Sequence, residues 1–191
     1  MEKVSAKELK NIENYLRFYD FEELSSKQSR QLIIKFNNKV SPVTYSDLQF
    51  NGDKEEYENK EKILIEFLKK LFKQFGETHC VIRKYDEKWV VNKEILPKLT
   101  TALTRYSVSN TFNGGILLEK DEILVDSFIS SVLRYNSFVQ FIFKTDEIVV
   151  SPTDHLDIFI ASKNIDGLER KILDNITVWG ADALEIGCNK G

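Results

Sequence analysis

The densest hydrophobic patterning in this 191-residue chain lies between Phe138 and Ala161. Apolar residues there form three short runs, which polar, turn-like segments separate. The runs cover residues 138–144, 148–150 and 156–161. Two of the runs alternate with a period of two, which is typical of β-strands, and both of their faces are largely apolar. We therefore expect a three-stranded meander in the middle of a sheet that helices cover.

Other stretches carry apolar residues at intervals of three and four, which predicts amphipathic helices. These stretches are 5–19, 54–75, 92–106, 121–134 and 165–173. The first has Ser5 as its N-cap and Glu8 three residues later, the arrangement of a capping box. The second is the longest, and its apolar stripe includes Leu68 and Leu71, while Lys69 belongs to the face expected in solvent.

Several shorter runs indicate further strands. A strand is expected over 31–36, and 176–179 could be another. Two hairpins are expected, one joining 80–84 to 89–91, the other joining 108–112 to 116–119 across Asn113-Gly114. Residues 180–191 are expected to form a tail of uncertain order.

These elements predict an α+β fold with a largely antiparallel sheet of about six to eight strands and four or five helices. The length suits a single globular domain spanning 1–191. A weak internal duplication of a helix and hairpin, 55–91 and 115–151, is a further hypothesis, because five of ten aligned positions agree around the two turns. Shared turn chemistry explains the same agreement without duplication.

Composition places the chain among ordinary globular proteins, with 42% hydrophobic and 30% charged residues. No uncharged apolar run reaches 18 residues, and the first residues lack an apolar signal core, so we expect a cytoplasmic protein that does not bind membranes. The two cysteines are too few for a disulfide framework.

Charge is distributed unevenly along the chain. Residues 1–110 contain 20 Lys and Arg against 17 Asp and Glu, whereas residues 111–191 contain 7 against 13. The acidic second half disfavours nucleic acid as a partner, because phosphate contacts need clustered Lys and Arg. It favours a basic protein partner, although the same charge could serve only to keep the chain soluble.

Acidic residues at helix starts and turns are the candidate contacts for such a partner. They are Asp121 and Glu122 at a helix start, Asp146 and Glu147 in one turn, and Asp154 in another. If these loops meet on one side of the sheet, the carboxylates would form a single acidic rim that steers a basic protein into contact.

Template motifs for phosphate loops, zinc proteases, thiol redox sites and serine hydrolases are missing from the sequence. The nearest approach to a site is 151–157, which contains Asp154, His155 and Asp157. Alternation would place the imidazole of His155 and the carboxylate of Asp157 on one face, which is the minimum for a general base with an orienting carboxylate. His79 could join them in a metal site, but the spacing does not require it, and no cofactor or metal is expected.

Two functions of different class follow from these observations. The first is a non-enzymatic protein-binding module, of the inhibitor or immunity type, that acts on a basic partner through its acidic C-terminal half. The second is a hydrolase or metal-dependent enzyme centred on His155 with Asp154 and Asp157. The sequence predicts no oligomeric state.

Overall fold

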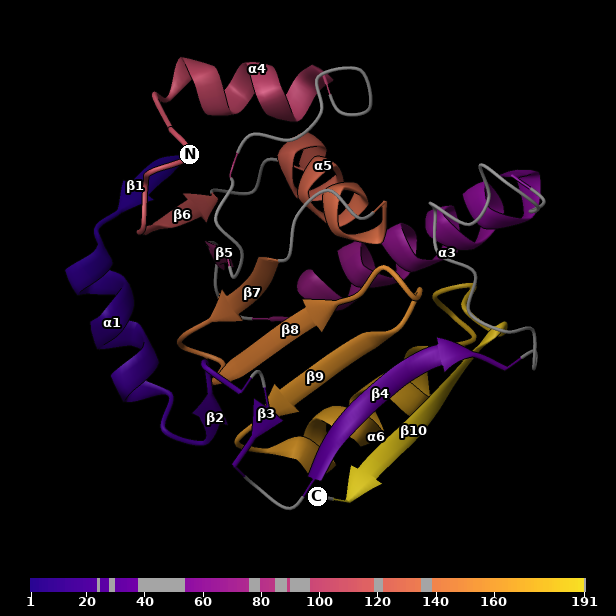
Figure 1. Ribbon diagram of the computed structural model, residues 1–191. Coiled ribbons are helices and arrows are strands. Elements are labelled where there is room, and N and C mark those ends of the chain that lie inside the picture. Colours follow the sequence, from indigo (N-terminus) through magenta and orange to yellow (C-terminus); the bar gives the residue numbers. More distant parts are fainter. Residues whose placement is uncertain are drawn as a thin grey trace.

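The computed structural model, drawn in Figure 1, has an α+β fold in which helices cover a central antiparallel sheet. The residues that the structure describes are 1–23, 25–27, 30–37, 54–75, 80–84, 89, 97–118, 122–134 and 139–190. Their helices are α1 (Ala6–Tyr15), α3 (Lys54–Phe72), α4 (Pro97–Arg105), α5 (Glu122–Leu133) and α6 (Ile165–Asn175). Their strands are β1 (Glu2–Val4), β2 (Tyr19–Asp20), β3 (Ser25–Ser26), β4 (Arg30–Phe36), β5 (Cys80–Lys84), β6 (Gly115–Leu118), β7 (Val139–Phe143), β8 (Ile148–Pro152), β9 (Ile158–Ser162) and β10 (Leu184–Lys190).

Eight of these strands form one sheet in the order β1-β6-β5-β7-β8-β9-β4-β10, and every neighbouring pair is antiparallel. The predicted sheet of six to eight strands with four or five helices is therefore confirmed. The predicted meander is confirmed as β7, β8 and β9, which lie side by side in the middle of the sheet. β2 and β3 form a separate two-stranded ribbon.

Helices α3, α5 and α6 cover one face of the sheet, and α4 packs on α5 (Figure 1). Aromatic rings join α3 to the central strands, because Phe72 lies 5.2 Å from Phe141 and 4.8 Å from Phe143 between ring centroids. A bidentate ion pair links α3 to the residue that follows α5. The Nε and Nη2 atoms of Arg134 each lie 2.7 Å from one oxygen of the Glu61 carboxylate. Side chains from every second residue of the central strands fill this layer.

The opposite face carries a smaller apolar cluster beneath α1 and the residues that follow it. Leu9, Leu16 and Tyr19 pack there against Ile142 and Val149 of the central strands. Helix α1 begins as predicted, because the Ser5 hydroxyl accepts the Glu8 N–H and the Glu8 carboxylate accepts the Ser5 N–H. Both faces of β7 and β8 are thus buried, which explains why these two strands are apolar on both sides.

The predicted hairpin between 80–84 and 89–91 is wrong. Strand β5 has β6 on one edge and β7 on the other, so both edges are already paired. Trp89 lies outside the strands, where its buried indole N–H donates to the Phe112 carbonyl oxygen over 2.7 Å. The apolar Trp89 side chain, which suggested a second strand, instead packs in the hydrophobic core.

The predicted hairpin between 108–112 and 116–119 is also wrong, because β6 pairs with β1 and β5, while 108–112 contain no strand and turn at 110–111. The reason lies at Gly114. A Cβ atom there would lie 2.1 Å from the Val4 carbonyl oxygen, so only glycine allows β1 to approach this closely. Gly114 therefore allows a close contact between two backbone segments and does not form a hairpin turn.

Two expectations about the last part of the chain need correction. Residues 176–179 form turns after α6, and the segment expected to be a tail contains β10, all seven residues of which pair with β4. Leu184, Ile186 and Cys188 alternate in the sequence, which is the signal that predicts this strand. The single domain and the internal duplication stay predictions, although the sheet takes strands from both ends of the chain. Within the described residues, each helix is too short or too polar to cross a bilayer.

Candidate functional site

The segment that sequence reasoning singled out connects β8 to β9 in a tight turn. The Thr153 N–H donates to the Asp157 carbonyl oxygen over 2.9 Å, and the Leu156 N–H donates to the Thr153 carbonyl oxygen over 3.2 Å. Leu156 has a φ of +61°, the left-handed region that a leucine rarely adopts. Its side chain is buried, so packing holds the backbone in this conformation.

Asp154 and His155 lie beside each other in this turn. The Asp154 side chain is 7% exposed and the His155 side chain 54%, and 4.0 Å separates the Asp154 Oδ1 and His155 Nε2 atoms. The Asp154 carboxylate therefore presents little surface to a partner, whereas the His155 imidazole presents more than half of its own. A separation of 4.0 Å is longer than a hydrogen bond, so these two side chains do not form the coupled pair that proton transfer uses.

Asp157 lies at the start of β9, next to a row of charges that continues across β4 and β10. Ile158 pairs with Ile34, which brings Asp157 close to Lys35, and the Lys35 Nζ lies 3.2 Å from a carboxylate oxygen of Glu185. Burial raises the pKa of the Asp157 carboxyl, while the positive charges of His155 and Lys35 act in the opposite direction. The row is alternately acidic and basic.

The residues that the structure describes contain no group of three His, Cys, Asp or Glu side chains that could hold a metal ion. Asp154, His155 and Asp157 therefore do not form such a group among themselves. His79 and Asp121 lie outside the described residues, and only the backbone of Glu122 is described. The hypothesis that His79 joins His155 stays a prediction.

The single acidic rim is wrong. Asp146 and Glu147 lie in the turn that enters β8, whereas Asp154 follows the end of β8, so the two turns are at opposite ends of a five-residue strand. Such a strand is about 17 Å long. Glu147 is also neutralised by Lys163, whose Nζ lies 2.8 Å from its carboxylate. Whether any of these residues binds a partner separately stays a prediction.

Sequence reasoning missed the edge of the sheet that β10 forms. The other edge strand, β1, has three residues, whereas β10 has seven. The Asn37 N–H donates to the Ala183 carbonyl oxygen over 3.0 Å just before β10 begins. Residues in an antiparallel ladder alternate between bonding toward the partner strand and pointing away from it. The main-chain N–H and C=O groups of Ile186 and Cys188 therefore point away from β4.

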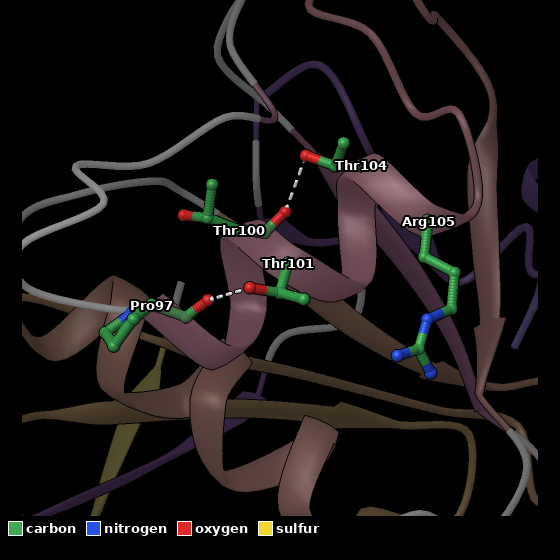
Figure 2. Close-up of a pocket in the computed structure, with 5 residues that line it drawn as sticks. All are labelled: Pro97, Thr100, Thr101, Thr104 and Arg105. Carbon is green, nitrogen blue, oxygen red and sulfur yellow. Dashed lines mark hydrogen bonds between the residues drawn. The ribbon is translucent and has the colours of Figure 1, made fainter.

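Sequence reasoning also missed two adjoining hollows along α4, of about 480 and 390 Å³. Both are lined by Pro97, Thr101 and Arg105. The Thr101 hydroxyl donates to the Pro97 carbonyl oxygen over 2.8 Å, and Thr104 donates in the same way to Thr100 over 2.9 Å. Figure 2 shows these two bonds within the helix and the Arg105 side chain extended beside it. The smaller hollow is also lined by Lys98, Ala102, Tyr106 and Leu124.

Comparison with known proteins gives no relative for this chain. No family model, no curated protein and no solved structure matches it.

Proposed function

We propose that this chain is a protein-binding module whose β10 edge accepts an extended segment of a partner protein as an added strand. The observation that carries the proposal is the length of this edge, because seven residues pair with β4 on one side and β10 is the last strand of the sheet among the residues that the structure describes. Proteins usually shorten or cover such edges, and a long edge is the surface that strand addition uses.

The charges around this edge support a basic partner, as the composition of the C-terminal half suggests. Asp182 is exposed just before β10, and Glu185, which pairs with Lys35, is exposed within it. Asp166 and Glu169 of α6 reach the same edge, where both contact the Arg30 guanidinium. Lysine or arginine side chains at every second position of an added strand would all lie on one face of the sheet. There they would meet Asp166 and Glu169 on the α6 side or Glu185 on the other. We propose that the binding module is of the inhibitor or immunity type.

The enzyme centred on His155 has less support. The imidazole lies 4.0 Å from the Asp154 carboxylate. The Thr153 hydroxyl oxygen accepts the backbone N–H of His155 over 3.3 Å, so this hydroxyl serves the turn itself. Hydrolysis would need a nucleophile or an activated water beside that imidazole.

A titration with short peptides tests the proposal. An eight-residue peptide of alternating Lys and Val should shift the amide NMR signals of Ile186 and Cys188 more than that of Gly187, which bonds toward β4. Cys188→Pro should abolish the shifts, because it removes an outward N–H, and an edge strand tolerates proline where the N–H faces away from the sheet. Cys188→Ala is the matched control, since it also loses the Arg30 contact with the Cys188 Sγ but keeps the N–H.

Two results would contradict this function. An equal response to a peptide of alternating Glu and Val would remove the basic partner, and shifts confined to other strands would remove the β10 edge. If analytical ultracentrifugation showed that the free protein dimerises and that Cys188→Pro abolishes the dimer, a second copy would replace the partner as the occupant of the edge.

A further inference from the structure

Helix α4 carries a basic, hydroxyl-bearing surface that the proposed protein-binding function does not use. Lys98, Thr101 and Arg105 are spaced by three and four residues, so they lie on one side of the helix. All three line the hollow of about 390 Å³, a size within the range of small-molecule sites. We call these residues, with Pro97, Ala102, Tyr106 and Leu124, the α4 hollow.

The two cations of the α4 hollow are available to a ligand. Lys98 and Arg105 are exposed, and within the described part of the chain neither has a carboxylate at salt-bridge distance. The Thr101 hydroxyl donates to its own helix. The donors that point out of this surface are therefore an ammonium and a guanidinium, and the guanidinium presents the planar fork that suits phosphate oxygens.

A purely structural explanation covers one of these cations but not the other. Arg105 is in the last turn of α4, where the helix dipole stabilises positive charge. Lys98 is in the first turn, where the dipole disfavours positive charge, and no acidic residue accompanies it there. A lysine placed against the dipole, two turns from an arginine on the same side, is explained by an anion that both side chains bind.

An apolar wall lies beside the cations. The Tyr106 side chain is 41% exposed, and it lines the hollow together with Leu124 and Pro97. The chain is fixed just after Tyr106, because Ser107 adopts a φ of +54° and its carbonyl oxygen accepts the Lys3 Nζ over 2.6 Å. The exposed Tyr106 ring, on a backbone fixed at the next residue, offers a flat group a surface on which to stack.

We propose that the α4 hollow binds a small phosphorylated molecule with a flat aromatic group, the chemical class of a nucleoside diphosphate. Lys98 and Arg105 hold the phosphates, and the aromatic group lies against Tyr106. This site is independent of the β10 edge, since it is built from α4, the residue that follows it and one residue of α5, and the two proposals can fail separately.

Isothermal titration of the full chain tests this site with three probes: ADP, pyrophosphate and adenosine. ADP should bind more tightly than either part alone. The double variant Lys98→Ala with Arg105→Ala should weaken ADP by about ten-fold or more, because a hydrogen bond to a charged group is lost at each position. Arg105→Lys should recover part of the loss. The matched control is Lys7→Ala with Arg170→Ala, which removes two exposed cations from other helices.

Tyrosine variants test the aromatic part separately. Tyr106→Phe should keep ADP affinity, and Tyr106→Ala should lower it several-fold without changing the affinity for pyrophosphate. Circular dichroism of each variant would show that α4 is retained. The site is overturned if ADP does not bind at millimolar concentration, or if the control double variant weakens ADP as much as the test double variant. Pyrophosphate binding as tightly as ADP would overturn the stacking role of Tyr106.

Discussion

At Leu156 the backbone conformation destabilises the fold, whereas burial of the side chain stabilises it. Its φ of +61° lies in the left-handed region, which costs an L-residue about 1–2 kcal/mol, and its side chain is 5% exposed. Burial of a leucine side chain contributes about 1.5–3 kcal/mol and offsets that cost. The turn between β8 and β9 therefore depends on this side chain being apolar and large.

A pair of substitutions separates the two effects. Leu156→Ala loses the buried side chain and keeps the strained backbone, whereas Leu156→Gly loses the side chain and relieves the strain. We expect urea denaturation to show the glycine variant more stable than the alanine variant by about 1 kcal/mol. At Leu168, which is buried in the middle of helix α6, the order should reverse by about the same amount. The same order at both positions would contradict the strain at Leu156.

Asp157, in the same turn, makes stability depend on pH. Because burial raises the pKa of its carboxyl above the ordinary value of 3.8, the folded protein keeps this proton at pH values where the unfolded chain has lost it. The stabilisation from this proton is complete below pH 3.8 and is lost as the pH rises through the folded-state pKa.

Asp157→Asn should therefore be more stable than the natural protein at pH 7, where the half-buried carboxylate is charged. The difference should shrink as the pH falls toward 3.8, because both side chains are then neutral. Thermal unfolding of the two proteins from pH 3 to pH 8 measures this. A natural protein that is the more stable of the two at pH 7 would show that the nearby positive charge of Lys35 outweighs burial.

Among the helices, α3 shows how well an amphipathic stripe predicts burial. Leu68 and Leu71 were predicted to face the core, and both are fully buried. The prediction for Lys69 was wrong, because its Nζ lies 3.2 Å from both Glu66 and Asp126, the latter on α5. The stripe identifies which side of a helix is apolar, but the partner that a boundary residue meets depends on the neighbouring helix.

This difference decides the control for a stability experiment. Leu68→Ala should lower the free energy of unfolding by about 2–5 kcal/mol, because it leaves a cavity between α3 and the sheet. Lys69→Ala would remove a contact with α5, so the exposed Lys62 is the better control, with Lys62→Ala expected within about 0.5 kcal/mol. Chemical denaturation with an unchanged slope measures both. A small effect of Leu68→Ala would mean that the helix is rotated.

Elements with strong local signals could be predicted from the sequence. The capping box of α1 needs only Ser5 and Glu8, and the meander needs only short turns between apolar runs. The two wrong hairpins failed because strand runs were paired with their nearest neighbours in sequence. Gly114 has the composition of a turn, yet its role depends on Val4, more than a hundred residues earlier in the chain. Nothing local distinguishes these two roles.

The candidate sites divide in the same way. The alternation of Leu184, Ile186 and Cys188 marks a strand, but only the order of the sheet shows that this strand is an edge. The spacing of Lys98, Thr101 and Arg105 by three and four residues predicts from the sequence that they share one side of a helix. Tyr106 follows the buried Leu103 by three residues, a spacing typical of one apolar helix face, yet it lines the hollow on the surface. Exposure of this kind depends on which helix packs against α4, and periodicity alone does not give that.

For the whole molecule, the position of β4 links the two ends of the chain, because β4 lies between β9 and β10. Pairings between such distant segments make folding slow, since the chain between them must be closed into a loop before any contact forms. During synthesis β4 leaves the ribosome early, with Leu32 and Ile34 on an apolar face and no strand yet made on either side. Until residues 158–190 are translated, β4 lacks both of its neighbours in the sheet, so we expect this apolar segment to be one that chaperones bind and that promotes aggregation during synthesis.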